Sequence, residues 1–154
     1  MNPQTIDIDS DIMLQYEQIR QYTEQQCKAL AKEDYVPQPV IYISPPKWHL
    51  AHTTWFFEEF VLKIHADNYQ VFDEEFGFLF NSYYNTLGAR ILRADRGNLT
   101  RPPVEEIYRY RSYVDKHMTD LIKSSGSKIK DLVILGLNHE QQHQELLYTD
   151  LKYI

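Results

Sequence analysis

The segment Asn138–Leu147 carries two histidines, His139 and His143, whose spacing could serve metal chemistry. The segment is predicted to be helical, and residues four apart project their side chains from one face of a helix, about one turn apart. A metal ion can bind two such imidazoles without strain in the backbone, and helix-borne pairs of this kind hold zinc and iron in other proteins. The pair therefore predicts a metal site that needs a further ligand.

A third histidine lies on a second predicted helix. His52 shares a helical face with Trp48 and Trp55, and the two indoles indicate that this face points into the protein interior. Neutral imidazoles from two helices would leave coordination positions open for substrate or oxygen, and an all-nitrogen set suits zinc, iron, nickel or copper alike. With no cysteine nearby, a closed structural zinc site is not expected.

Two alternatives stay open for the histidines. His49 competes with His52 as the third ligand, because it lies about 60° around the same helix. We favour His52 because both tryptophans share its face. A buried histidine can also hydrogen-bond a carbonyl or a carboxylate and bind no metal at all. The remaining histidines, His65 and His117, are expected to be ordinary surface residues.

Polar residues follow the first histidine of the pair. Glu140 comes directly after His139, as in the H-E-x-x-H motif of metalloproteases, but here the second histidine comes one residue later, so that motif is not met. Glu140 is expected to be solvated or to lie behind the ligands. The amides of Gln142 and Gln144 could reach a cleft or face water, and the second alternative is favoured for Gln144.

Arg90 and Arg93 lie three residues apart in a stretch rich in aromatic residues. Such a pair can clamp the carboxylate of a small anionic substrate. The alternative is that both are surface charges that pair with the acidic excess of the chain.

The spacing of apolar residues predicts four long helices. The stretch 66–101 forms a connection far longer than a bundle needs, with turns at Gly88 and Gly97, and long ordered connections are often functional. Four helices with one long crossover loop predict an all-α four-helix bundle, with residues 1–154 as one domain. The expected helices run from a cap at Asp9 or Ser10 to about Lys32, from a capping Ser44 to about His65, from Thr100–Pro103 to about Lys123, and from Lys128 to the end.

The composition narrows the classes of function. The net charge is −6 and no basic block stands out, so nucleic acid is not expected as a partner. The single Cys27 excludes an internal disulfide and suits a reducing compartment. No apolar run approaches the length of a membrane span, and the N-terminus lacks a signal-peptide pattern. We therefore expect a cytoplasmic protein that does not act at a membrane.

Four blocks of the sequence resemble the N-terminal DinB-like domain of the sulfoxide synthases of ergothioneine biosynthesis. The resemblance covers nearly the whole chain and is far more specific than a lone histidine motif. The blocks are P-P-K-W-H-L-A-H-T-T-W-F-F-E, F-N-S-Y-Y-N-T-L-G-A-R, R-A-D-R-G-N-L-T-R-P-P-V-E-E-I-Y-x-Y-R and L-G-L-N-H-E-Q-Q-H-Q-E-L-L-Y-T-D-L-K-Y.

The resemblance implies a DinB-like bundle and an oxidoreductase with non-haem iron(II), known as a hercynine oxygenase. Such an enzyme uses oxygen to join the sulfur of γ-glutamylcysteine or cysteine to the imidazole of hercynine, and it leaves a sulfoxide. Carried over by motif, the iron ligands are His52, His139 and His143. Zinc, nickel or manganese could replace the iron in the purified protein.

The resemblance also implies substrate contacts and a partner. Gln142 would assist the binding of hercynine, and Arg90 and Arg93 would meet the carboxylate of the thiol substrate. The chains of this family continue past the position of Ile154 into a C-terminal domain of the formylglycine-generating-enzyme type, which holds the catalytic tyrosine. We therefore assign no catalytic residue to this chain, and we expect that the missing domain or a separate subunit completes the site.

Two other functions remain open from the sequence. One is a stand-alone DinB-like thiol transferase that uses zinc or nickel without oxygen chemistry. The other is a non-catalytic bundle that forms a homodimer through an exposed helix face and whose histidines make only hydrogen bonds.

Overall fold

The computed structural model describes residues 8–82 and 89–154, and the side chains from residue 11 onward. The described residues contain no β-strand. Their helical elements are α1 (Ile8–Cys27), the 3₁₀ turn η1 (Lys32–Tyr35), α2 (Pro46–Phe57), the π-helical η2 (Glu58–Leu62), α3 (Lys63–His65), α4 (Phe76–Leu79), the 3₁₀ turn η4 (Arg93–Asn98), α5 (Val104–Asp150) and the 3₁₀ turn η5 (Leu151–Tyr153).

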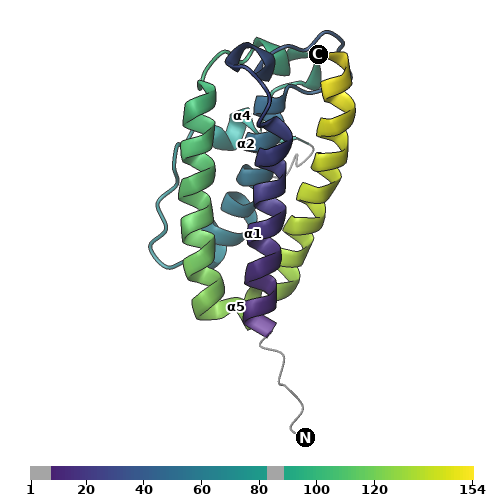
Figure 1. Ribbon diagram of the computed structural model, residues 1–154. Coiled ribbons are helices and arrows are strands. Elements are labelled where there is room, and N and C mark those ends of the chain that lie inside the picture. The colour runs from purple at the N-terminus through teal and green to yellow at the C-terminus, as the bar shows by residue number, and fades with distance from the viewer. Residues whose placement is uncertain (1–7, 83–88) are drawn as a thin grey trace, which may run out of the picture.

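The long helices form a bundle in which α5 supplies two members (Figure 1). The 47 residues of α5 are interrupted at Ser125, whose φ of −146° and ψ of 18° are not helical, so the chain reverses there. The second half of α5 runs parallel to α1, whereas α2 and the first half of α5 run the opposite way. This arrangement confirms the predicted all-α bundle and the predicted turn in the Ser124–Ser127 stretch.

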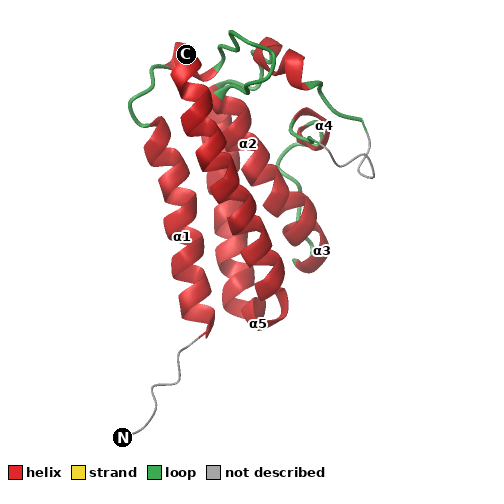
Figure 2. Cartoon of the chain, turned by 90° about the vertical axis from the view of Figure 1, so that its right-hand side faces the viewer, coloured by secondary structure: helices red, strands yellow, loops and turns green. Residues whose placement is uncertain are grey.

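One long crossover, residues 66–103, returns the chain from the end of α3 to the start of α5. It carries α4 and η4, and α3 and α4 lie on the side of the bundle away from α1 (Figure 2). The predicted turn at Gly88 lies outside the described residues, whereas Gly97 lies within η4. Among the described residues, no helix is both long enough and apolar enough to cross a membrane.

The ends of the first two helices differ from the predicted ends. Helix α1 begins at Ile8, ahead of the predicted caps, and ends at Cys27 rather than near Lys32. The prediction that Ser44 caps the next helix is wrong, because Pro45 is the capping residue. Ser44 instead uses its backbone N–H to bind the Asp150 carboxylate, 106 residues later in the chain.

The run from α2 through α3 is continuously helical to His65, as predicted, but it contains the π-helical turn η2. Glu58, the first residue of this turn, is buried. Its carboxylate accepts hydrogen bonds from the hydroxyls of Tyr69 and Tyr110, both at 2.6 Å, and from the backbone N–H of Phe72 at 3.0 Å. These bonds fasten the start of the crossover to the bundle.

Every residue of α2 is buried, because the helix is covered by its neighbours in the bundle and by the crossover. At Gly136, helix α5 packs directly against the rings of Phe56 and Phe57 in α2. A Cβ at Gly136 would lie 2.5 Å from Cε1 of Phe57, closer than non-bonded carbons pack. Glycine at this position therefore lets the second half of α5, one turn before His139, lie against α2.

We predict that Gly136→Ala lowers the free energy of unfolding by about 2 kcal/mol. An extra methyl group in a packed core costs up to about 3 kcal/mol, and two rigid aromatic rings surround this one. The roughly 1 kcal/mol that alanine gains over glycine inside a helix offsets only part of this cost. Urea unfolding measures the change. The control is Gly77→Ala, since a Cβ at Gly77 has its nearest neighbour at an ordinary 3.5 Å. Equal stability of Gly136→Ala and the parent protein would contradict the steric argument.

Candidate metal centre

The three predicted metal ligands meet between α2 and the second half of α5. One side-chain nitrogen from each of His52, His139 and His143 lies within 4.8 Å of the other two. The ring centroids are 5.0 Å apart for His52 and His139, and 4.7 Å apart for the other two pairs. Because a metal–nitrogen bond is about 2.0–2.1 Å, nitrogens that share an ion lie within about 4 Å, so small ring rotations would close the set.

His52 is fixed from both its ring edge and its faces. Its Nδ1 lies 2.6 Å from the carbonyl oxygen of Phe80, to which it donates a hydrogen bond. The indole of Trp48 stacks on the imidazole at 4.4 Å and that of Trp55 at 5.3 Å, both nearly parallel to it. The carbonyl takes up Nδ1, so Nε2 is the nitrogen that remains for a ligand.

His49, the alternative to His52, lies behind His143 instead of joining the set. Its Nδ1 is 3.0 Å from Nδ1 of His143, and its Nε2 is 2.9 Å from the Asp150 carboxylate. Both ring nitrogens of His49 therefore have hydrogen-bond partners in the protein. This geometry favours the predicted choice of His52 over His49.

His139 lacks the hydrogen bond that His49, His52 and His143 have. Its Nδ1 is buried and has no hydrogen-bond partner in the described part of the chain. A buried polar atom without a partner is costly, and a metal ion bound through Nδ1 would satisfy it. The three imidazoles therefore fit a metal ion. Histidines that served only as hydrogen-bonding groups would leave this nitrogen unsatisfied.

The four clustered histidines are held in the neutral form that metals bind. Burial lowers the pKa of His139 to about 4. Burial also lowers the pKa of His49, and it lowers those of His52 and His143 further because neighbouring histidines add repulsion. Near pH 7 each ring therefore keeps a lone pair, and no proton has to leave before a metal binds.

A cavity of about 400 Å³ opens beside the histidines. Of the predicted substrate residues, Gln142 and Arg93 line it. Arg90 lies next to it, where its guanidinium donates to the carbonyl oxygen of Ser82. Their substrate roles stay predictions. The described lining residues are Tyr42, Ser44, Trp48, His49, His52, Ser82, Arg93, Arg96, His139, Gln142, His143, Leu146 and Asp150.

Arg96 is a residue of this site that sequence reasoning did not single out. Its guanidinium carbon lies 3.3 Å from the centre of the Trp48 ring, and it donates hydrogen bonds to the hydroxyls of Ser44 at 2.8 Å and Ser82 at 3.0 Å. Arg96 is buried and covers the face of Trp48, which itself stacks on His52. Its spacing from the other arginines gave no signal of this role.

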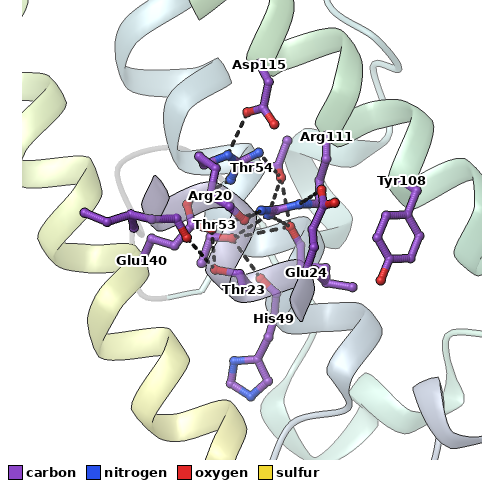
Figure 3. A network of polar contacts seen from close by, with 12 residues as sticks. Arg20, Thr23, Glu24, His49, Thr53, Thr54, Tyr108, Arg111, Asp115 and Glu140 are labelled. Carbon is purple, nitrogen blue, oxygen red and sulfur yellow. Dashed lines mark hydrogen bonds and ion pairs between the residues drawn. The ribbon is translucent and has the colours of Figure 1, made fainter. Parts of the chain in front are cut away.

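Glu140 is the centre of a buried polar network, so the first of its two expected placements, a solvated side chain, is wrong (Figure 3). Its carboxylate accepts from Arg20 at 2.9 Å, Arg111 at 3.1 Å and the Thr23 hydroxyl at 2.7 Å. Burial alone would raise the pKa of Glu140, but the two guanidiniums outweigh it and lower the pKa. The carboxylate is therefore ionised and holds α5 against α1.

Gln144 is also buried, which corrects the view that it faces water. Its amide donates to the carbonyl oxygen of Ile19 at 2.8 Å and to the Thr23 hydroxyl at 3.0 Å. Gln144 lies four residues after Glu140 and therefore on the same face of α5. That face lies against α1, one step around the helix from the face that carries the metal ligands.

The chain belongs to the DinB superfamily, whose sequence pattern it matches over residues 15–147. This match agrees with the four-helix bundle and covers all three histidines of the cluster. No curated protein matches the chain.

The lowered histidine pKa values predict that the metal-free protein loses stability as the pH falls below about 6.5, the unfolded value. In that range the histidines of the unfolded chain are protonated, whereas the buried imidazoles of the folded protein stay neutral. Each such histidine therefore adds a slope of about 1.4 kcal/mol per pH unit to the free energy of unfolding. Urea unfolding with a chelator, between about pH 7 and pH 5, measures the slope. We expect His139→Gln to make it shallower and His65→Gln, at an exposed position, to leave it unchanged. A pH-independent stability would refute the burial of neutral rings.

A second prediction concerns the Glu140 network. Glu140→Ala leaves the buried guanidiniums of Arg20 and Arg111 without their shared carboxylate, and we expect a loss of about 3–5 kcal/mol. Lys63→Ala is the control, since it removes an ion pair to Glu59 from a partly exposed lysine, where such pairs contribute at most about 1 kcal/mol. Similar losses in the two variants, measured by urea unfolding, would show that the network does not hold the helices.

Proposed function

We propose that this chain is the iron(II)-binding N-terminal domain of an ergothioneine-biosynthesis sulfoxide synthase. The observation that carries the proposal is the meeting of His52, His139 and His143 at a cavity that Gln142 and Arg93 also line. The four sequence blocks that resemble this enzyme class include all five residues. Membership of the DinB superfamily is consistent with the proposal.

In the proposed reaction, hercynine, a thiol and dioxygen give a sulfoxide and one water. The carbon–sulfur bond replaces the C–H bond of the hercynine imidazole and the S–H bond of the thiol. One oxygen atom goes to sulfur, and the other leaves as water with both hydrogens. Bound iron(II) would supply the site where oxygen is reduced, and three neutral ligands would leave it cationic enough to attract a thiolate.

The residues of this chain would hold the substrates in place. Arg93 presents a guanidinium at the cavity, where it could pair with the carboxylate of γ-glutamylcysteine or cysteine. Gln142 lies on α5 next to His143 and lines the cavity, where its side-chain amide would hydrogen-bond hercynine. Arg90 would support this region through the Ser82 carbonyl, since Ser82 lines the cavity.

Further substrate contacts would come from a partner that covers the cavity, either a C-terminal domain or a separate subunit. Apolar groups on its rim are exposed: Tyr42 at 59% and Leu146 at 46% of their full surface. Tyr153 packs edge-on against Tyr42, with ring centroids 5.7 Å apart. A rim of this kind suits burial under another protein surface.

A zinc- or nickel-dependent thiol transferase is the second candidate, because all-nitrogen ligation does not select iron. It would use the same three histidines and need no oxygen. Consumption of oxygen that depends on both hercynine and a thiol distinguishes the two functions. A bundle whose histidines make only hydrogen bonds is disfavoured, since Nδ1 of His139 has no described partner.

The ligand assignment predicts that the chain binds one iron(II) per molecule under anaerobic conditions. We expect His52→Ala and His143→Ala each to weaken binding more than the roughly 10–100-fold that loss of an outer contact causes. His65→Ala, at an exposed histidine, is the control. Unchanged affinity in His143→Ala would remove it from the ligand set.

The reaction is tested with the iron-loaded chain together with a C-terminal partner domain of the proposed enzyme class. We expect oxygen uptake and sulfoxide formation only when hercynine and thiol are both present. Arg93→Met should raise the KM for the thiol, because the carboxylate loses its cationic partner. Iron binding without product formation by the assembled protein would reject the proposed reaction while leaving the metal site intact.

A further inference from the structure

Three side chains are joined end to end by hydrogen bonds at the edge of the metal centre. One oxygen of Asp150 lies 2.9 Å from Nε2 of His49, and Nδ1 of His49 lies 3.0 Å from Nδ1 of His143. Asp150 and His49 are both buried. Of the three, only His143 belongs to the group of possible ligands.

The positions of the protons on these three side chains follow from the donor and acceptor capacity of each group. A carboxylate only accepts hydrogen bonds, so Nε2 of His49 carries the proton between His49 and Asp150. A neutral imidazole has one N–H, so Nδ1 of His49 is then an acceptor. The proton between the two rings therefore belongs to Nδ1 of His143, and the lone pair of His143 is on Nε2.

We propose that His49 and Asp150 are positioning residues that hold His143 in its Nδ1–H tautomer, so that Nε2 presents its lone pair to the metal. Without these two hydrogen bonds, a histidine side chain favours the opposite tautomer, in which Nε2 carries the proton and cannot bind a metal. The inference rests on the metal site of the proposed function, but neither on the identity of the metal nor on the reaction.

Asp150 is itself held in place independently of His49. The oxygen that accepts from His49 also accepts the backbone N–H of Ser44 at 2.9 Å. Ser44 comes directly before Pro45 and Pro46, which have no N–H to offer, so its amide is the last donor before α2. The carboxylate at the end of α5 is therefore anchored to the start of α2, and the orientation of both rings follows from that anchor.

Two of the three possible ligands are thus oriented by hydrogen bonds, each in a different way. Nδ1 of His52 donates to the Phe80 carbonyl, Nδ1 of His143 reaches a carboxylate through His49, and Nδ1 of His139 has no described partner. A carboxylate behind a ligating imidazole raises the basicity of the imidazole more than a neutral carbonyl does. His143 is therefore the ligand whose strength depends most on residues that do not touch the metal.

The tautomer of His143 can be measured directly in the metal-free protein. Two-bond nitrogen–proton correlations in the nuclear magnetic resonance spectrum distinguish the two tautomers of each histidine ring. We expect His143 to be Nδ1–H and His49 to be Nε2–H in the parent protein, and His143 to shift toward Nε2–H in His49→Phe. An Nε2–H tautomer of His143 in the parent protein would overturn the proposal without the need for any variant.

The coupling between His49 and Asp150 is tested by cobalt(II) affinity and the visible spectrum of the bound cobalt. We expect His49→Phe and Asp150→Ala each to weaken cobalt binding roughly 10–100-fold. The double variant should bind cobalt no more weakly than His49→Phe, because the effect of Asp150 on the metal site passes through His49. Effects that multiply in the double variant would mean that the two residues act independently, and would contradict the proposal.

Conservative variants separate positioning from general loss of structure. Asp150→Asn can keep an oxygen acceptor for Ser44 and His49, so it should recover most of the affinity lost in Asp150→Ala. Glu58→Gln is the matched control, since it changes another buried carboxylate of the bundle that contacts none of the four histidines. It should leave the cobalt affinity and the His143 tautomer unchanged even where the melting temperature falls. Loss of affinity in this control equal to that in Asp150→Ala would overturn the specific role of Asp150.

Discussion

The buried carboxylate of Glu140, shared by the guanidiniums of Arg20 and Arg111, is the interaction on which the rest of the structure depends (Figure 3). It joins α1 to both halves of α5 in the interior of the bundle. Arg111 also donates to the carbonyl oxygen of Leu50 in α2 at 3.0 Å, so one cluster contacts all the long helices. Charges buried in this way tolerate few alternative arrangements, since any shift leaves one of them without a partner. The cluster therefore fixes the register of the helices that carry the three clustered histidines.

The two neighbouring faces of the second half of α5 have separate tasks. His139 and His143 face the cavity, whereas Glu140 and Gln144 lie about 100° further round the helix and face α1. Six consecutive residues thus combine the anchor to α1 with two of the three possible metal ligands. Because Glu140 directly follows His139, the buried carboxylate fixes the position of His139 through the adjacent backbone.

Helical spacing was sufficient to predict the bundle, its crossover and the convergence of His52 with the α5 pair. The i, i+4 spacing fixes which side chains share a face, and the tryptophans indicated which face of α2 carries the ligand. Spacing could not show that Glu140 and Gln144 are buried. Polar residues on a helix face usually indicate exposure to water, so the polar face of α5 that packs against α1 gave no sign of burial. The arginines that neutralise Glu140 lie 120 and 29 residues away in the sequence.

Other parts of the site depend on contacts that leave no local pattern. Ser44 before two prolines has the usual form of a helix cap, yet its amide binds Asp150 at the far end of the chain. The spacing of the arginines does not distinguish Arg96 from Arg90 and Arg93, yet Arg96 is the one that is buried, against the Trp48 ring. The hydrogen bonds of His49 to His143 and Asp150 also leave no pattern in the sequence, since every residue of α2 is buried and the two partners lie 94 and 101 residues away.

The stacking around His52 has an optical consequence. Trp48 and Trp55 are the two tryptophans of the chain, and both lie almost parallel to the imidazole of this one possible ligand. All of the indole emission therefore originates next to the metal centre. An ion with a partly filled d shell, such as iron(II) or cobalt(II), quenches indole emission at this range, whereas zinc with its filled shell does not absorb the emitted light. The ultraviolet fluorescence of the unlabelled protein thus reports both the arrival of a metal and its electronic class.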